Sequence, residues 1–176
     1  MEIGFATEVC IGIRFRAVCF AAIFALAGLL PGRVLGGDAS LLLNGKALHL
    51  DSQDGQSYNE RNWGLGLQYE FSEPDRNWIP FVSASEFRDS VGNVSWYAGG
   101  GILRRYGLPI KGSHLDLGLI GFAMHREDYN RGRLFPGLLP VISIGSGRVA
   151  LNVTYVPKID PKMVALVFFQ LRIALF

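Results

Sequence analysis

The sequence predicts an all-β protein, an eight-stranded antiparallel up-and-down barrel that spans a membrane. First, residues 63–71 alternate between a large, aromatic face and a face that is small or polar. Alternation with a period of two is typical of a strand, and this combination of faces is typical of a strand in contact with lipid. Second, the mean hydropathy is +0.25, yet no apolar run beyond residue 40 approaches the roughly 20 residues of a membrane-spanning helix. The apolar residues are therefore expected in strands.

The first 36 residues are expected to be a signal peptide, and residues 37–176 the barrel. Arg14 and Arg16 precede an apolar segment at 17–30, and small residues follow it. This order is typical of a secretory signal, with cleavage expected after Gly36 or Ala39. An uncleaved membrane anchor is the alternative. Both cysteines, at positions 10 and 19, lie in this segment, so the mature chain is expected to have no disulfide and no thiolate metal site.

Eight segments of strand length follow, each near the roughly 9 to 11 residues of a tilted membrane strand. The second is the alternating run described above. In the eighth, alternate apolar residues from 167 to 175 lie opposite Gln170 and Arg172, although the terminal Phe176 falls out of this register. The strands are expected at residues 40–50, 61–71, 78–87, 94–104, 114–124, 138–146, 149–156 and 163–175.

The connections between these segments alternate in character. Those at 72–77, 107–112 and 145–147 contain the Gly, Pro, Asn and Asp residues that close hairpins. The other four are on average longer and more charged. A chain that enters the outer membrane from the periplasm exposes its odd-numbered connections outside, which here are the charged ones. The alternative is a soluble barrel of the lipocalin type, which also has eight strands.

The charge of the chain does not indicate a nucleic acid as a partner. The sequence has 17 basic and 15 acidic residues, and residues 37–176 retain 14 and 13 of them. A nearly balanced charge does not predict a nucleic-acid-binding protein.

Several motifs together resemble the lipid A palmitoyltransferase family. Residues 58–64, with the sequence YNERNWG, are similar to the segment that closes the first outer loop of that family. Asp89 and Ser90 match the Asp-Ser pair of its second outer loop, and the likeness continues through residues 138–145 and 153–157. The resemblance implies an acyltransferase of the bacterial outer membrane, a monomer without cofactor or metal. It would move a fatty acyl chain from a phospholipid to lipid A.

The resemblance also assigns roles to glycines and prolines. It implies that Gly64 and Gly66 face a lumen that holds one acyl chain, and that Gly101 forms the floor of this lumen. Glycines that let a tight barrel bend are the alternative. Pro140 and Pro157 match family prolines near gaps in the strand pairing through which lipids enter sideways, because a proline donates no hydrogen bond to the ladder. An ordinary proline at a strand end is the alternative.

The chemistry of the resemblance depends on His49, Asp89 and Ser90. Acyl transfer to a hydroxyl needs a base and a group that stabilises the oxyanion. Counted back from Tyr58, the histidine position of the family falls at Gly45, and this chain has His49 four residues later. On a regular strand His49 would share that face and lie about 13 Å further along. We expect His49 to be the base, Asp89 to orient the imidazolium and Ser90 to bond near the reacting carbonyl.

Two other functions stay open from the sequence. One is a non-catalytic barrel that has lost the family reaction together with the histidine, and the other is a lipid hydrolase that uses water as the acceptor. His125 is a second candidate at the outer rim. Basic residues on the outer connections either pair with lipid A phosphates or form a solvated loop surface. They are Arg88, Arg126, Arg131, Arg133, Lys158 and Lys162.

Overall fold

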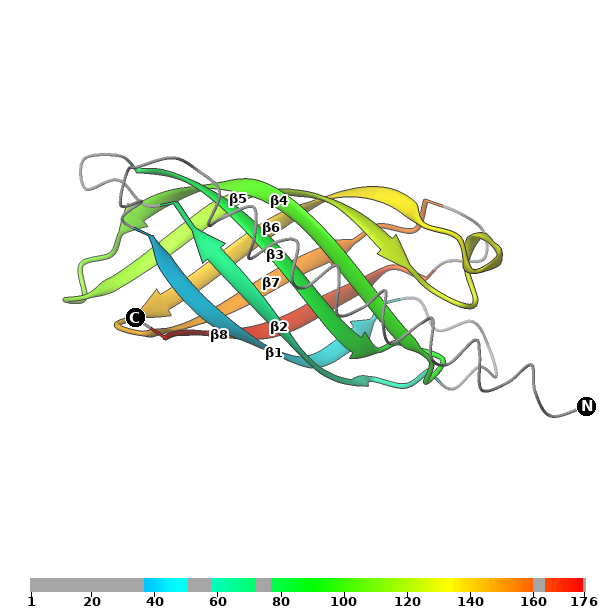
Figure 1. Cartoon of the computed structure of the whole chain (residues 1–176). Coiled ribbons are helices and arrows are strands. Elements are labelled where there is room, and N and C mark those ends of the chain that lie inside the picture. Colours follow the sequence, from blue (N-terminus) through cyan, green and yellow to red (C-terminus); the bar gives the residue numbers. More distant parts are fainter. Residues whose placement is uncertain (1–36, 51–57, 72–76, 160–163, 176) are drawn as a thin grey trace, which may run out of the picture. The chain divides into compact units, whose positions relative to one another are not determined.

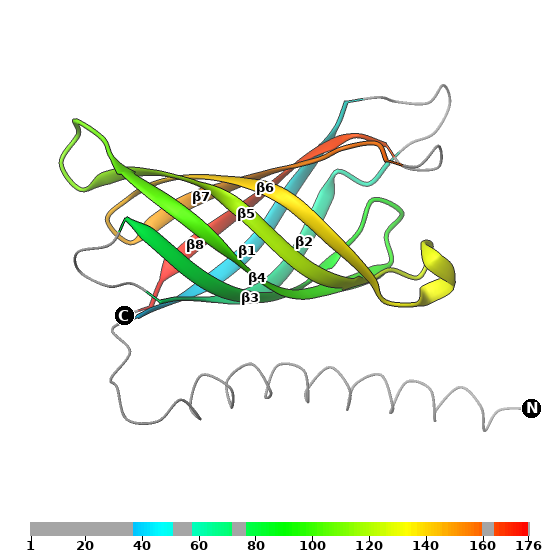
Figure 2. The same ribbon diagram turned by 90° about the horizontal axis from the view of Figure 1, so that it is seen from above.

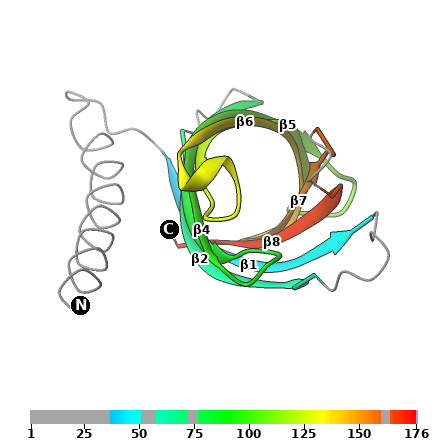
Figure 3. The ribbon, with the colours of Figure 1, turned by 90° about the vertical axis from the view of Figure 1, so that its right-hand side faces the viewer.

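Eight antiparallel strands form a closed barrel in the computed structural model, which describes residues 37–50, 58–71, 77–159 and 164–175 (Figure 1). Each strand pairs with its neighbours in the sequence, and β1 also pairs with β8, so that the strands form a closed ring when viewed along the barrel (Figure 3). The strands are β1 (Asp38–His49), β2 (Arg61–Glu70), β3 (Trp78–Arg88), β4 (Val94–Gly107), β5 (Ser113–His125), β6 (Phe135–Ser146), β7 (Val149–Val156) and β8 (Leu166–Ala174).

The predicted fold class and order of strands are confirmed. Two strands are three residues longer than expected: β4 ends at Gly107 rather than at residue 104, and β6 begins at Phe135 rather than at residue 138 because residues 135–137 pair with β5. A 3-10 turn, η1 (Asn130–Gly132), precedes it, where Asn130 and Arg131 have positive φ angles of 51° and 56°. The predicted signal peptide lies outside the described residues. Among the residues that are described, no helix is long and apolar enough to cross a membrane.

Large apolar side chains cover the outside of the barrel. On β2, Trp63 and Leu65 are 67% and 60% exposed, whereas Gln68 and Glu70 on the other face are buried. At the opposite end of the barrel, the Arg104 guanidinium lies over the rings of Trp78 and Tyr106, 5.2 and 5.5 Å from their centres. An apolar exterior edged by aromatic residues, with a polar interior, is the arrangement of a membrane barrel. It excludes the lipocalin-type alternative, whose exterior would be polar.

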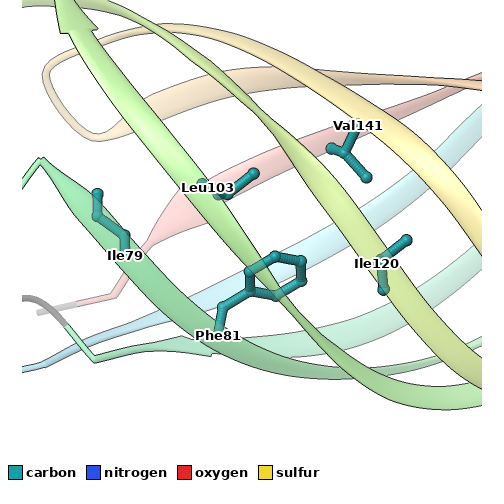
Figure 4. Packing of buried hydrophobic residues seen from close by; sticks show 5 residues of the cluster. All are labelled: Ile79, Phe81, Leu103, Ile120 and Val141. Carbon is teal, nitrogen blue, oxygen red and sulfur yellow. The ribbon is translucent and has the colours of Figure 1, made fainter.

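An apolar cluster fills the inner side of strands β3 to β6. The cluster consists of Ile79, Phe81, Leu103, Ile120 and Val141, each at most 8% exposed (Figure 4). Tyr97, Phe122 and Leu139 pack against it. The interior of the barrel is therefore packed on this side, which agrees with the small diameter of an eight-stranded barrel.

Buried ionic groups join opposite walls of the barrel. Arg172 on β8 pairs with Glu70 on β2 and with Asp116 on β5, the latter at 3.3 Å. Arg105 on β4 forms two hydrogen bonds with Asp116, at 2.8 and 2.9 Å. Because Arg172 is buried, its charge is compensated by these carboxylates rather than by water.

A second polar network lies further along the lumen. The Asn44 side-chain amide donates to the Ser85 hydroxyl at 2.6 Å, and the Gln170 amide donates to the side-chain oxygen Oδ1 of Asn44 at 2.7 Å. Gln170 also accepts from Asn152 at 3.2 Å. These contacts show that Asn44, Ser85 and Gln170 face the interior, which fixes the inward face of β1 as far as residue 44.

Candidate active site

The outer rim is formed by the end of β1, the start of β2 and the turn between β3 and β4. Antiparallel order places the ends of β1 and β3 on the same side of the barrel, as Figure 2 shows. The turn after β3 carries Asp89 and Ser90, and His49 is the last residue of β1. Residues 41 positions apart in the sequence therefore meet at one edge.

His49 and Ser90 are in direct contact. The His49 Nε2 atom lies 2.8 Å from the Ser90 hydroxyl oxygen. The imidazole also stacks on the ring of Tyr58, with 4.6 Å between ring centres and 17° between ring planes. A hydrogen bond at one edge and a stacked face together fix the orientation of the ring.

Asn59 joins the segment before β2 to the turn that carries Ser90. Its backbone N–H donates to the Ser90 carbonyl at 2.7 Å, and its side-chain amide donates to the Asp89 carbonyl at 3.0 Å. Asn62 adds a bond from its amide to the Arg88 carbonyl at 2.7 Å. The motif at residues 58–64 therefore holds the second outer turn against the first strand.

Asp89 is bonded to its own turn rather than to His49. The buried carboxylate accepts from the backbone N–H groups of Val91 and Asn93 at 3.1 and 2.9 Å. Its second oxygen accepts from the Ser95 hydroxyl at 2.9 Å and lies 3.9 Å from Arg126 Nε. No hydrogen bond or ion pair joins it to His49 in the described part of the chain. The predicted contact, in which Asp89 orients the imidazolium, is therefore replaced by a structural role in the turn.

A β-bulge changes how His49 relates to Gly45. The register of β1 against β8 shifts between Asn44 and Ala47, and both of these residues are buried. His49 follows Ala47 by two positions and therefore faces inward with it. His49 lies an even number of residues after Gly45, but across the bulge this spacing no longer puts the two residues on the same face. Before the bulge the residue that faces inward is Asn44, not Gly45. The bulge is what the pattern of residue types did not reveal.

His49 lies beyond the apolar band of the barrel. The exposed ion pair between Lys46 and Glu60, at 3.2 Å, already lies on the outer side of Trp63, and His49 is further along the strand. Burial lowers the pKa of His49 below 6.5, Glu60 opposes this effect, and the positive charge of Arg126 adds to it. The ring is therefore neutral at pH 7 and able to accept a proton.

The three glycines predicted to line the lumen lie on inward faces, close to neighbouring strands. A Cβ atom at Gly64 would collide with the backbone of Glu86 and Phe87, and one at Gly66 would lie 2.6 Å from the Ser85 side chain. At Gly101 it would meet the Phe81 ring at 2.7 Å. Phe81 therefore occupies the space that the missing side chain of Gly101 leaves.

The pairing between β6 and β7 stops at Pro140. The last pair is Val141 with Thr154, although β6 continues back to Phe135 and β7 continues to Val156. Pro140 is exposed on the outside, and Pro157 follows β7 directly. Because a proline donates no ladder hydrogen bond, Pro140 stands where the β-sheet opens towards the outer rim.

The other two histidines lie apart from His49 and Ser90. His125 stacks on Trp96, with 5.8 Å between the ring centres. Both residues lie on the outward faces of their strands, next to residues that face inward. His114, near the start of β5, lies 3.6 Å from the Asp116 carboxylate at the other end of the barrel. No group of three or more His, Cys, Asp or Glu side chains within the described ranges could hold a metal ion.

A family model and the curated relatives with similar sequences carry the same family name. Residues 39–171 match the family described as "Antimicrobial peptide resistance and lipid A acylation protein PagP". The lipid A acyltransferase PagP of Bordetella pertussis (strain Tohama I) is 31% identical over 125 residues, which cover 69% of this chain and 68% of that protein. The PagP of Laribacter hongkongensis is 35% identical over 100 residues, or 57% and 47% of the two chains. Among solved structures, the Yersinia pestis outer membrane protein Ail is 14% identical with a TM-score of 0.42, covering 78% of this chain and 99% of that one.

Proposed function

The chain belongs to the PagP family of lipid A acylation proteins, and from this premise we propose that His49 and Ser90 carry out its acyl transfer at the outer rim. It is an outer-membrane acyltransferase that moves a fatty acyl chain from a phospholipid to lipid A. The observation that carries the proposal is the 2.8 Å contact between His49 Nε2 and the Ser90 hydroxyl. This contact makes the rim the place where a base and a hydroxyl meet.

His49 acts as the general base. The lowered pKa keeps its imidazole neutral near pH 7, and a neutral imidazole accepts a proton from a hydroxyl as the hydroxyl attacks an ester carbonyl. Tyr58 and Ser90 hold the ring in place. Asp89 acts indirectly, because it shapes the turn that presents Ser90.

The donor phospholipid reaches the rim through the gap between β6 and β7. A lipid in the surrounding membrane can enter a barrel wall only where the ladder of hydrogen bonds is open, and the pairing of β6 with β7 ends at Val141. Pro140 keeps this gap free of a ladder bond. Each of the eight described strands has a paired neighbour on both sides, so that no strand is free along its whole length to pair with a second chain, which supports a monomer.

The basic outer side chains support lipid A as the acceptor. Arg88, which ends β3, and Arg131 and Arg133, which lie between β5 and β6, are exposed at this end of the barrel. Guanidinium groups bind phosphate oxygens in pairs of parallel hydrogen bonds. They would orient a phosphorylated lipid above the rim.

A transfer assay tests this proposal. Purified protein is mixed with a phospholipid that carries a labelled acyl chain and with lipid A, and the labelled products are separated. We expect labelled lipid A, with His49→Ala about 10²- to 10⁴-fold slower and His125→Ala as the matched control at the unaltered rate. Label released only as free fatty acid would indicate a hydrolase. No label transfer by any form of the protein would indicate a non-catalytic barrel.

A further inference from the structure

We propose that Ser90 is a covalent nucleophile, which carries the acyl chain as a serine ester between the phospholipid and the acceptor. This inference rests on the proposed function, because it divides the same acyl transfer into two steps. It assigns to Ser90 a different part from the expected one, in which the hydroxyl assists by hydrogen bonding to the reacting carbonyl.

The geometry is that of a nucleophile and its base. A serine hydroxyl is a weak nucleophile unless a base within roughly 2.6–3.2 Å removes its proton. His49 Nε2 lies 2.8 Å from the Ser90 oxygen. An attacking acceptor hydroxyl would have to displace Ser90 from this nitrogen before His49 could act on it directly, whereas Ser90 is already in position.

The hydroxyl of Ser90 is not needed to build the turn. Asp89 accepts the backbone N–H groups of Val91 and Asn93, and the Asp89 carbonyl accepts from Gly92 N–H at 3.0 Å. Asn59 holds the carbonyl of Ser90. Within the described residues, the one hydrogen bond of the Ser90 hydroxyl goes to His49. A serine with a structural role would bond its hydroxyl to the backbone of the turn, whereas the hydroxyl of Ser90 bonds to the base, His49.

The site is a dyad rather than a triad. When Nε2 accepts the serine proton, Nδ1 carries the other ring proton, and Nδ1 is buried without a hydrogen-bond partner in the part of the chain that is described. The stacked ring of Tyr58 takes over the positioning that a carboxylate gives in a triad.

The two steps balance without any further reactant. In the first, the Ser90 proton passes to His49 Nε2, the serine oxygen bonds to the donor carbonyl carbon, and the ester bond of the phospholipid breaks. The imidazolium returns the proton to the departing lysophospholipid alcohol. In the second, His49 takes the proton of the acceptor hydroxyl, whose oxygen bonds to the same carbon. Ser90 leaves and recovers the proton.

Omitting lipid A isolates the first step. The purified full chain is incubated with a phospholipid of a single acyl composition, and its intact mass is measured. We expect a mass increase of one acyl group, located at Ser90 by peptide mapping, which disappears when lipid A is added, with lipid A carrying that acyl group as the product. Ser90→Ala abolishes the adduct and lowers transfer by on the order of 10³-fold or more. Ser90→Cys retains an adduct, now a thioester that hydroxylamine cleaves.

Ser146→Ala is the matched control, since this exposed serine ends β6 at the opposite end of the barrel. It should keep both the adduct and the transfer rate. Transfer to lipid A by Ser90→Ala at the unaltered rate, or transfer without any adduct on Ser90, would overturn the nucleophile while the lipid A acyltransferase stands. An adduct at Ser90 that lipid A does not discharge supports the nucleophile and contradicts the proposed acceptor.

Discussion

Replacing Asp89 by Asn separates two roles that this carboxylate could have. The structure bonds it to the turn through Val91 and Asn93, and not to the imidazole of His49. An asparagine of the same shape keeps an oxygen for these two N–H groups. It changes only the second oxygen, which accepts from Ser95 and lies 3.9 Å from Arg126.

The expected loss is small for a structural role. A hydrogen bond to a charged group contributes about 1.5–3 kcal/mol, and the Ser95 hydroxyl can reverse to accept from the new amide. A net cost of about 1–2 kcal/mol corresponds to a factor of about 5–30 in the population of the ordered turn. By contrast, replacing the carboxylate that orients a catalytic histidine in a serine hydrolase triad lowers kcat by about 10⁴-fold.

The assay is the rate of acyl transfer to lipid A, measured together with urea unfolding of the barrel. Asp89→Asn should lose about 5- to 30-fold in kcat/KM. Ser95→Ala is the matched variant, because it removes the same hydrogen bond from the other partner, and it should lose a similar factor. A loss near 10⁴-fold in Asp89→Asn with Ser95→Ala unaffected would refute the structural role and restore Asp89 as the partner of His49.

Three further outcomes follow from contacts at the rim and in the lumen. Burial lowers the pKa of His49, so kcat/KM should fall with acid only below pH 6.5, and Arg126→Gln should move this limb to higher pH, as a pH–rate profile would show. Asn59→Ala loses a bond to the turn, worth about 1–3 kcal/mol with the carbonyl left unpaired, and should lower kcat about tenfold with KM unchanged in steady-state assays. Arg172→Met leaves carboxylates buried and should cost about 3–5 kcal/mol in urea unfolding, which Glu70→Gln partly restores.

The fold could be predicted from the sequence because the side chains along each strand alternate between residues suited to lipid and residues suited to the barrel interior. The alternation of Trp63 and Leu65 with glycines and polar residues is a local property, and it needs no knowledge of the neighbouring strands. The outward aromatic face also distinguished a membrane barrel from a soluble one. The start of β6 was harder to predict, because Pro136 favours a loop unless one knows that β7 leaves this part of the strand unpaired.

The site could be predicted only in part from the sequence, since its contacts depend on distances between segments that are far apart in the chain. Asp89 and Ser90 are adjacent in the sequence, yet the Asp89 carboxylate bonds to its own turn and the Ser90 hydroxyl bonds to His49. Residue types alone do not show which of the two side chains forms its hydrogen bonds within the turn. The role of Phe81 was missed for the same reason, because a phenylalanine on β3 covers Gly101 on β4 only when the register of the two strands is known.

The position of His49 shows how a histidine at a different place in the sequence can reach the same Asp-Ser pair. His49 reaches Ser90 because the bulge after Asn44 resets the inward face of β1, and because residues 58–62 bring the second turn towards it. A histidine retained by chance at a rim would have no reason to be stacked, half-buried and bonded to the serine of the matching Asp-Ser pair. The motif that identifies the family thus lacks the histidine but holds it in place: Tyr58 stacks on the ring, and Asn59 bonds the backbone carbonyls of Asp89 and Ser90 in the turn whose serine the ring contacts.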